Sequence, residues 1–122
     1  MPSKDFVRSN ADGTGRVYQV TAAQAWDIAK TVFRWEGADD ISENHEEDYI
    51  IASIGKGFFS YDAAMCVWID PADSENTVVA VATKRNDLTK ATSFTETTFY
   101  WRFSQAVEIV NAGGTLPASP PN

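Results

Sequence analysis

The chain has 122 residues, 43% of them hydrophobic and 22% charged, which is typical of one globular domain with a core of its own. Its formal net charge of −7 argues against a nucleic-acid partner, because phosphate binding needs a basic surface. No stretch approaches the roughly 20 apolar residues of a membrane span, and no signal peptide is visible, so we expect a soluble domain.

The first part of the chain predicts a strand and then a capped helix. Residues 1–14 are polar and contain turn formers, which predicts a flexible lead-in. Residues 16–20 are a strand candidate, and Thr21-Ala22-Ala23-Gln24 then matches a capping box, in which the Thr and Gln side chains bond the backbone N–H groups of the first turn. A helix is predicted over about 22–36, ending at Gly37. Its apolar face consists of Ala25, Trp26, Ala29, Val32 and Phe33.

The middle of the chain predicts β structure. The acidic segment 39–48 is compatible with a short strand and a turn, and 49–54 is a strand rich in β-forming residues. Residues 59–70 and 77–84 are expected to form an antiparallel hairpin. Side chains of the first hairpin strand alternate between two faces. One face carries Tyr61, Ala63, Met65, Val67 and Ile69, and the other carries Asp62, Ala64, Cys66, Trp68 and Asp70.

The last part of the chain predicts a second helix and a tail. Ser93-Phe94-Thr95-Glu96 matches another capping box, and Gly113-Gly114 ends the helix that follows it. Residues 113–122 are rich in proline and glycine, so no regular element is expected and the tail is predicted to be disordered. The apolar positions of this helix are Phe99, Phe103, Ala106, Val107 and Val110.

These elements predict an α+β domain over residues 15–112. The expected architecture has two layers, with a three- to four-stranded antiparallel β-meander and two helices packed on one face, in the order β-α-β-β-β-α. The other face of the sheet would stay open to solvent, and Trp68 could lie on either side of the sheet.

The acidic segment holds the only histidine of the chain, His45. Carboxylates with one imidazole can bind a divalent cation, so Glu43, His45 and Glu47 are candidate metal ligands. The spacing does not fit an EF-hand loop, and a solvated acidic turn is the favoured interpretation. Any histidine-dependent catalysis would have to use His45, but no sequence motif marks a nucleophile, and the sequence predicts neither an enzyme nor a cofactor.

Aromatic side chains offer a second candidate site. Phe58, Phe59, Tyr61 and Trp68 would form a binding patch if they faced solvent on the open side of the sheet. The favoured interpretation is that these rings complete the core. Cys66 lies in an apolar run and is expected to be a small buried residue, since a single thiol cannot form an internal disulfide.

Three segments together resemble small uncharacterised exported domains of bacteria, many of them lipoproteins. They are Trp35-Glu36-Gly37-Ala38, Tyr49-Ile50-Ile51-Ala52 and the helix entry Phe94-Thr95-Glu96-Thr97-Thr98-Phe99. The resemblance covers residues 16–111 and brings no catalytic residue. It implies a place in the periplasm or cell envelope, where 1–14 would tether the domain to a membrane; the alternative is a cytoplasmic protein.

The sequence leaves three functional hypotheses in order of preference. The first is a non-catalytic binding or assembly module of a bacterial envelope, with a protein partner or self-association through the open sheet face. The second is a domain that binds a small ligand or a divalent metal, and the third is a small cytosolic enzyme that uses His45. No known small molecule is implied.

Overall fold

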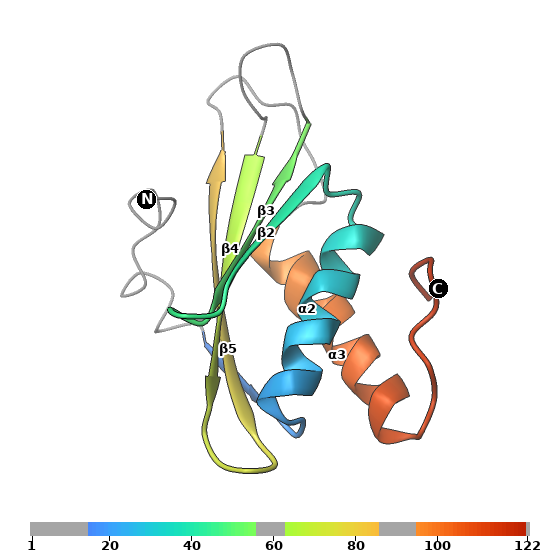
Figure 1. Cartoon of the computed structure of the whole chain (residues 1–122). Helices are drawn as coiled ribbons and strands as arrows, with labels where there is room; N and C mark the ends of the chain where they lie inside the picture. The colour runs from blue at the N-terminus through green and yellow to red at the C-terminus, as the bar shows by residue number, and fades with distance from the viewer. Residues whose placement is uncertain (1–14, 56–62, 86–94, 122) are drawn as a thin grey trace.

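The computed structural model describes residues 15–55, 63–85 and 95–121, and both helices found there cover one face of a sheet (Figure 1). In these ranges, five strands form one antiparallel sheet in the order β1-β5-β4-β3-β2. The α+β class and the predicted element order are therefore confirmed, with five strands in place of three or four. The elements are β1 (Arg16–Tyr18), α2 (Ala22–Trp35), β2 (Asp40–Asn44), β3 (Tyr49–Ile54), β4 (Ala63–Pro71), β5 (Thr77–Arg85) and α3 (Glu96–Asn111).

The sheet is a meander with one added edge strand. Strands β2 to β5 pair with their neighbours in the chain, whereas β1 precedes α2 and pairs with β5 at the far edge. The acidic segment supplies β2, which pairs with β3 over its full length, from Asp40 opposite Ser53 to Asn44 opposite Tyr49. The predicted strand count was too low because both edge strands are short, and sequence patterns indicate short polar edge strands only weakly.

The first helix begins and ends where the sequence predicts. The Thr21 hydroxyl accepts from the Gln24 N–H at 3.1 Å, and the Gln24 side chain accepts from the Thr21 N–H at 2.9 Å. Gly37 has a φ of 84°, a backbone conformation that costs glycine little, so it ends the helix after Glu36. The capping box thus fixes the residue at which α2 begins after β1.

The second helix begins later than the capping box at Ser93 predicts. The N-cap is Thr95, whose hydroxyl accepts from the Thr98 N–H at 3.1 Å, and the helix starts at Glu96. The Glu96 carboxylate accepts from the Thr83 N–H on β5 at 3.0 Å, so the first residue of the helix is tied to the sheet. In the described part of the chain, no helix is long and apolar enough to cross a membrane.

The core lies between the sheet and the two helices. The helix-facing set in β4 is Ala63, Met65, Val67 and Ile69, as the alternation predicts, and the aromatic rings of α2 and α3 pack over it. A second, smaller cluster occupies the other face of the sheet. Its buried members are Tyr49, Ile51, Cys66, Trp68 and Ala80. The burial predicted for Cys66 is thus confirmed, and its thiol belongs to this second cluster.

Side chains of α3 complete the outer edge of β5. Strand β1 pairs with β5 only as far as Val79, so the backbone of β5 beyond that point lacks a strand partner on this side among the described residues. The Tyr100 hydroxyl accepts from the Val81 N–H at 3.2 Å, and Glu96 accepts from the next outward N–H, that of Thr83. Glu96 and Tyr100, which lie one turn apart on α3, therefore accept from the N–H groups of Thr83 and Val81 on β5.

The tail after α3 has no helix or strand up to residue 121, and it lies against the helix layer. Figure 1 shows it running back along the side of the helices that faces away from the sheet. The Trp35 indole donates to the Pro117 carbonyl at 2.9 Å, and Arg102 donates to the Pro121 carbonyl. Leu116 packs against the core. These anchors come from residues far from the tail in sequence, so the composition of 113–122 alone could not predict them.

Candidate functional site

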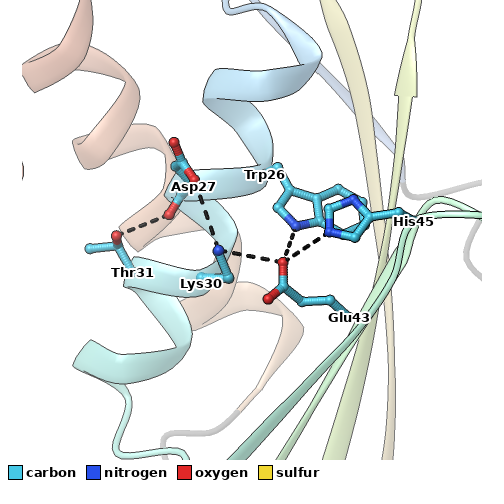
Figure 2. Close-up of polar contacts among 6 residues, drawn as sticks. All are labelled: Trp26, Asp27, Lys30, Thr31, Glu43 and His45. Atoms are coloured by element: carbon cyan, nitrogen blue, oxygen red, sulfur yellow. Dashed lines mark hydrogen bonds and ion pairs between the residues drawn. The ribbon is translucent and has the colours of Figure 1, made fainter.

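A polar cluster joins α2 to the edge strand β2 (Figure 2). Glu43 lies on the helix-facing side of β2, two residues after Ile41, which packs against the core. Trp26 and Lys30 lie one turn apart on α2, so both side chains can reach the same point on the strand. His45 follows β2 directly and brings its ring onto Trp26.

The contacts of the cluster converge on one oxygen atom, Glu43 Oε1. It accepts from Trp26 Nε1 at 2.5 Å, and it lies 3.4 Å from Lys30 Nζ and 3.3 Å from His45 Nε2. The rings of Trp26 and His45 are stacked, with centroids 4.3 Å apart and planes 24° from parallel. Lys30 also lies 4.0 Å from Asp27, so its charge is shared between two carboxylates.

These contacts favour the ionised form of Glu43. The hydrogen bond from Trp26 is the main cause that lowers the pKa of the Glu43 carboxyl, and the hydrogen bond and charge of Lys30 lower it further. A carboxyl whose pKa is lower in the folded state stabilises the fold above its unfolded pKa. That stability is lost as the pH falls through the folded pKa. The cluster should therefore hold β2 against α2 at neutral pH and weaken in acid.

We expect Glu43→Gln to destabilise the domain at about pH 7 and to have a much smaller effect at about pH 3. The amide keeps an oxygen acceptor for Trp26 but removes the negative charge that Lys30 contacts. Urea unfolding at the two pH values measures the difference. Glu47→Gln is the control, because Glu47 is exposed in the next turn. An equal loss at both pH values, or the same profile for both variants, would contradict the prediction.

A hollow of about 360 Å³ lies beside the stacked rings. It is lined by Ala22, Ala23, Trp26, Asp27, His45 and Asp48. Asp48 has a φ of 59°, a left-handed conformation that Asp tolerates better than most residues, and its carbonyl accepts from the Ile69 N–H at 3.0 Å. This bond holds the turn that joins β2 and β3 against strand β4. The hollow thus combines two aromatic rings with two carboxylates, Asp27 on α2 and Asp48 on the positioned turn.

The structure brings two of the three predicted metal ligands together. Glu43 and His45 are in contact, whereas Glu47 lies in the turn with its side chain exposed, and its N–H donates to Asn44 Oδ1 at 2.9 Å. Across the described ranges, no group of three His, Cys, Asp or Glu side chains is arranged to hold a metal ion. The geometry therefore offers a pair of interacting groups in place of a three-ligand site.

The predicted aromatic patch is not exposed at Trp68, the one member that the structure describes. Trp68 lies on the sheet face away from the helices, but only 5% of it is exposed, because it packs with Tyr49, Cys66 and Ala80. Phe58, Phe59 and Tyr61 lie outside the described residues. The favoured interpretation of Trp68 as a core residue is confirmed.

Trp26, Asp27 and Lys30 are site residues that the sequence pattern does not indicate. Trp26 was assigned to the apolar face of α2, and it does pack at the border of the core, but its indole nitrogen points to Glu43. One sequence feature could have indicated these site residues: Trp26 and Lys30 are four residues apart on a predicted helix that precedes an acidic segment.

His45 is more accessible than a buried catalytic imidazole would be. Its side chain is 72% exposed and contacts the Glu43 carboxylate and the Trp26 ring at the rim of the hollow.

Comparisons with protein-family models, curated proteins and solved structures gave no match to this chain. The site geometry therefore carries the functional argument.

Proposed function

We propose that this domain is a non-catalytic binding module that holds a basic side chain of a protein partner in the hollow beside Trp26 and His45. The observation that carries the proposal is the pair of stacked rings flanked by the carboxylates of Asp27 and Asp48. Aromatic faces attract cations, and nearby carboxylates add a direct charge interaction.

Several features of this surface support a cationic ligand. Asp27 and His45 are largely exposed, so a partner can reach them without rearranging the fold. The net charge of −7 steers a basic partner toward the domain over long range. The Glu43 carboxylate already receives Trp26, Lys30 and His45, so the negative charge for a ligand comes from Asp48 and from Asp27, which contacts Lys30 only at 4.0 Å.

The proposed place of action is a bacterial cell envelope. This address rests on the resemblance of residues 16–111 to exported bacterial domains, and a membrane tether through 1–14 is part of the proposal. Fractionation of cells that express the complete gene product tests it. Recovery with the envelope fraction is expected, and recovery with the cytosol would reject the address and leave the binding proposal untouched.

The binding proposal predicts that Asp27→Asn together with Asp48→Asn weakens binding of pentalysine about fivefold or more. Asn tolerates the left-handed backbone at position 48, so the turn should keep its shape. Titration followed by nuclear magnetic resonance measures the affinity and shows whether the Trp26 indole signal moves. His45→Ala is a second variant, since removing an exposed ring should weaken binding without loss of core packing.

The matched control is Glu75→Gln with Glu108→Gln, which changes the net charge equally at exposed positions outside the hollow. We expect this control to weaken pentalysine binding less than the Asp27 and Asp48 pair does. If both pairs weaken binding equally, or if the Trp26 signal stays in place during titration, the binding depends on overall charge and the proposed site is rejected.

A further inference from the structure

Strand β2 has one side that no described strand covers. It lies at the edge of the sheet and pairs only with β3, through all five of its residues. Asp40, Ser42 and Glu43 are exposed, and Ile41 is half-buried against the core. Alternate residues of an antiparallel edge strand direct their N–H and C=O groups away from the sheet. The outer side of β2 is therefore a template on which an extended chain can add as a further strand.

The opposite edge of the sheet is a poorer template. Strand β1 has only three residues and pairs with β5 as far as Val79. Beyond that point, side chains of α3 take the outward donors of β5, because Tyr100 accepts from the Val81 N–H and Glu96 accepts from the Thr83 N–H. In the part of the chain that the structure describes, β2 is thus the longer of the two sheet edges.

The charge of the β2 edge indicates which kind of chain fits it. Strand β2 and the turn after it carry the carboxylates of Asp40, Glu43, Glu46, Glu47 and Asp48. Two copies of the chain paired through β2 would bring two such acidic edges together, and like charges on neighbouring strands destabilise the pairing. A basic segment meets the opposite charge instead. The edge therefore favours an extended basic segment over a second copy.

The carboxyl end of β2 leads to the hollow beside Trp26 and His45. Ile41 packs against the core, Glu43 contacts Trp26 and His45 stacks on Trp26, so these three alternate residues share the helix-facing side. Every second side chain of an added antiparallel strand lies on this same side. One of them covers Ile41, and another, four residues earlier in the added segment, lies beside His45 at the hollow.

We infer that β2 docks an extended basic segment of a partner protein, which adds to the sheet as an antiparallel strand and places a lysine or arginine in the hollow. The inference rests on the proposed function, because that side chain is the ligand of the hollow. Main-chain hydrogen bonds to an edge strand supply affinity, and alternate side chains supply specificity. The expected segment has a basic residue four positions before an apolar residue, which covers Ile41.

The probe is the capped peptide Thr-Lys-Thr-Lys-Thr-Val-Thr, titrated into the full chain. Two derivatives carry N-methyl groups at its odd or its even positions, which removes backbone donors and keeps every side chain. Only alternate residues of an added strand bond β2, so we expect one derivative to bind about tenfold more weakly than the parent peptide and the other to bind within about threefold of it. Nuclear magnetic resonance should show the amide signals of 41–44 shifting and exchanging more slowly with deuterium.

Two results would overturn the inference. Equal binding of the three peptides would show that the lysines bind without strand pairing. Movement of the signals of 41–44 when the chain alone is concentrated would show that the edge binds a second copy.

The variant that combines Asp27→Asn with Asp48→Asn separates this inference from the proposed function. If it loses affinity for all three peptides while they bind the unaltered chain equally, the hollow stands and strand addition is rejected. If it binds the parent peptide as tightly as the unaltered chain does while the derivatives differ, the hollow is rejected, and with it the inferred place of the basic side chain.

Discussion

Phe33→Ala should lower the free energy of unfolding by about 3–5 kcal/mol, the largest effect expected for any single change considered for this chain. Phe33 is fully buried where α2 meets α3 and the sheet, and its ring centroid is 5.1 Å from that of Phe99. Truncation removes a large apolar area and leaves a cavity that the packed rings of α3 cannot fill. Urea unfolding followed by far-ultraviolet circular dichroism measures the change.

Trp101→Ala is the control for Phe33→Ala, because it also truncates a large aromatic residue of the helix layer. Trp101 is mostly exposed and its described ring contact is with Arg102, so we expect a loss of less than about 1 kcal/mol. Similar losses for both variants would show that α2 and α3 do not share the aromatic core described above.

The elements predicted best are those whose pattern repeats within one segment. The capping box at Thr21 and the glycine at position 37 fix the ends of α2 through contacts between residues close in sequence. Alternation in β4 separates the helix-facing set from the set that contains Cys66 and Trp68 for the same reason, since the side-chain period of a strand is two. Sequence patterns are therefore sufficient to predict helix ends and strand faces where both interacting residues belong to one element.

The edge strands and the tail depend on distant partners, and the sequence predicted them less well. Strand β2 is mostly polar because its outer side faces solvent, so its pattern resembles a turn. Trp35 and Pro117 are 82 residues apart in sequence, and nothing near either residue indicates their contact. A proline-rich composition excludes helix and strand, but it does not exclude an ordered tail held by side chains of another element.

The candidate site was predicted only in part, because its residues come from two elements that are distant in sequence. Glu43 and His45 belong to one acidic segment, so the sequence indicated them as candidate metal ligands, although a solvated acidic turn was the favoured interpretation. The partner that changes this chemistry is Trp26, 17 residues before Glu43 on another element. Its ring and the Lys30 charge occupy the carboxylate that a cation would otherwise need, and this arrangement follows only from the packing of α2 against β2.

Tyr100→Phe should lower the free energy of unfolding by about 1–3 kcal/mol, because it leaves a buried backbone donor of β5 without an acceptor. The Tyr100 hydroxyl accepts from the Val81 N–H and lies 3.5 Å from the carbonyl of Val79, the last residue of β5 that pairs with β1. The ring remains, so core packing is nearly unchanged and the effect reports the hydrogen bonds. Urea unfolding gives the energy, and hydrogen exchange at the Val81 amide shows whether this edge opens.

Tyr49→Phe is the matched control for Tyr100→Phe, because it removes the same atom from a ring that is equally buried. The Tyr49 hydroxyl accepts from Asn44 Nδ2 at 3.1 Å, and Asn44 is only partly buried, so water can replace the lost acceptor. We therefore expect a smaller loss, with no faster exchange at Val81. If the two variants lose the same stability and Val81 exchanges equally slowly in both, the contact between α3 and the edge of β5 does not protect the sheet. Faster exchange in Tyr100→Phe alone would show that a helix side chain takes the place of a missing strand partner there.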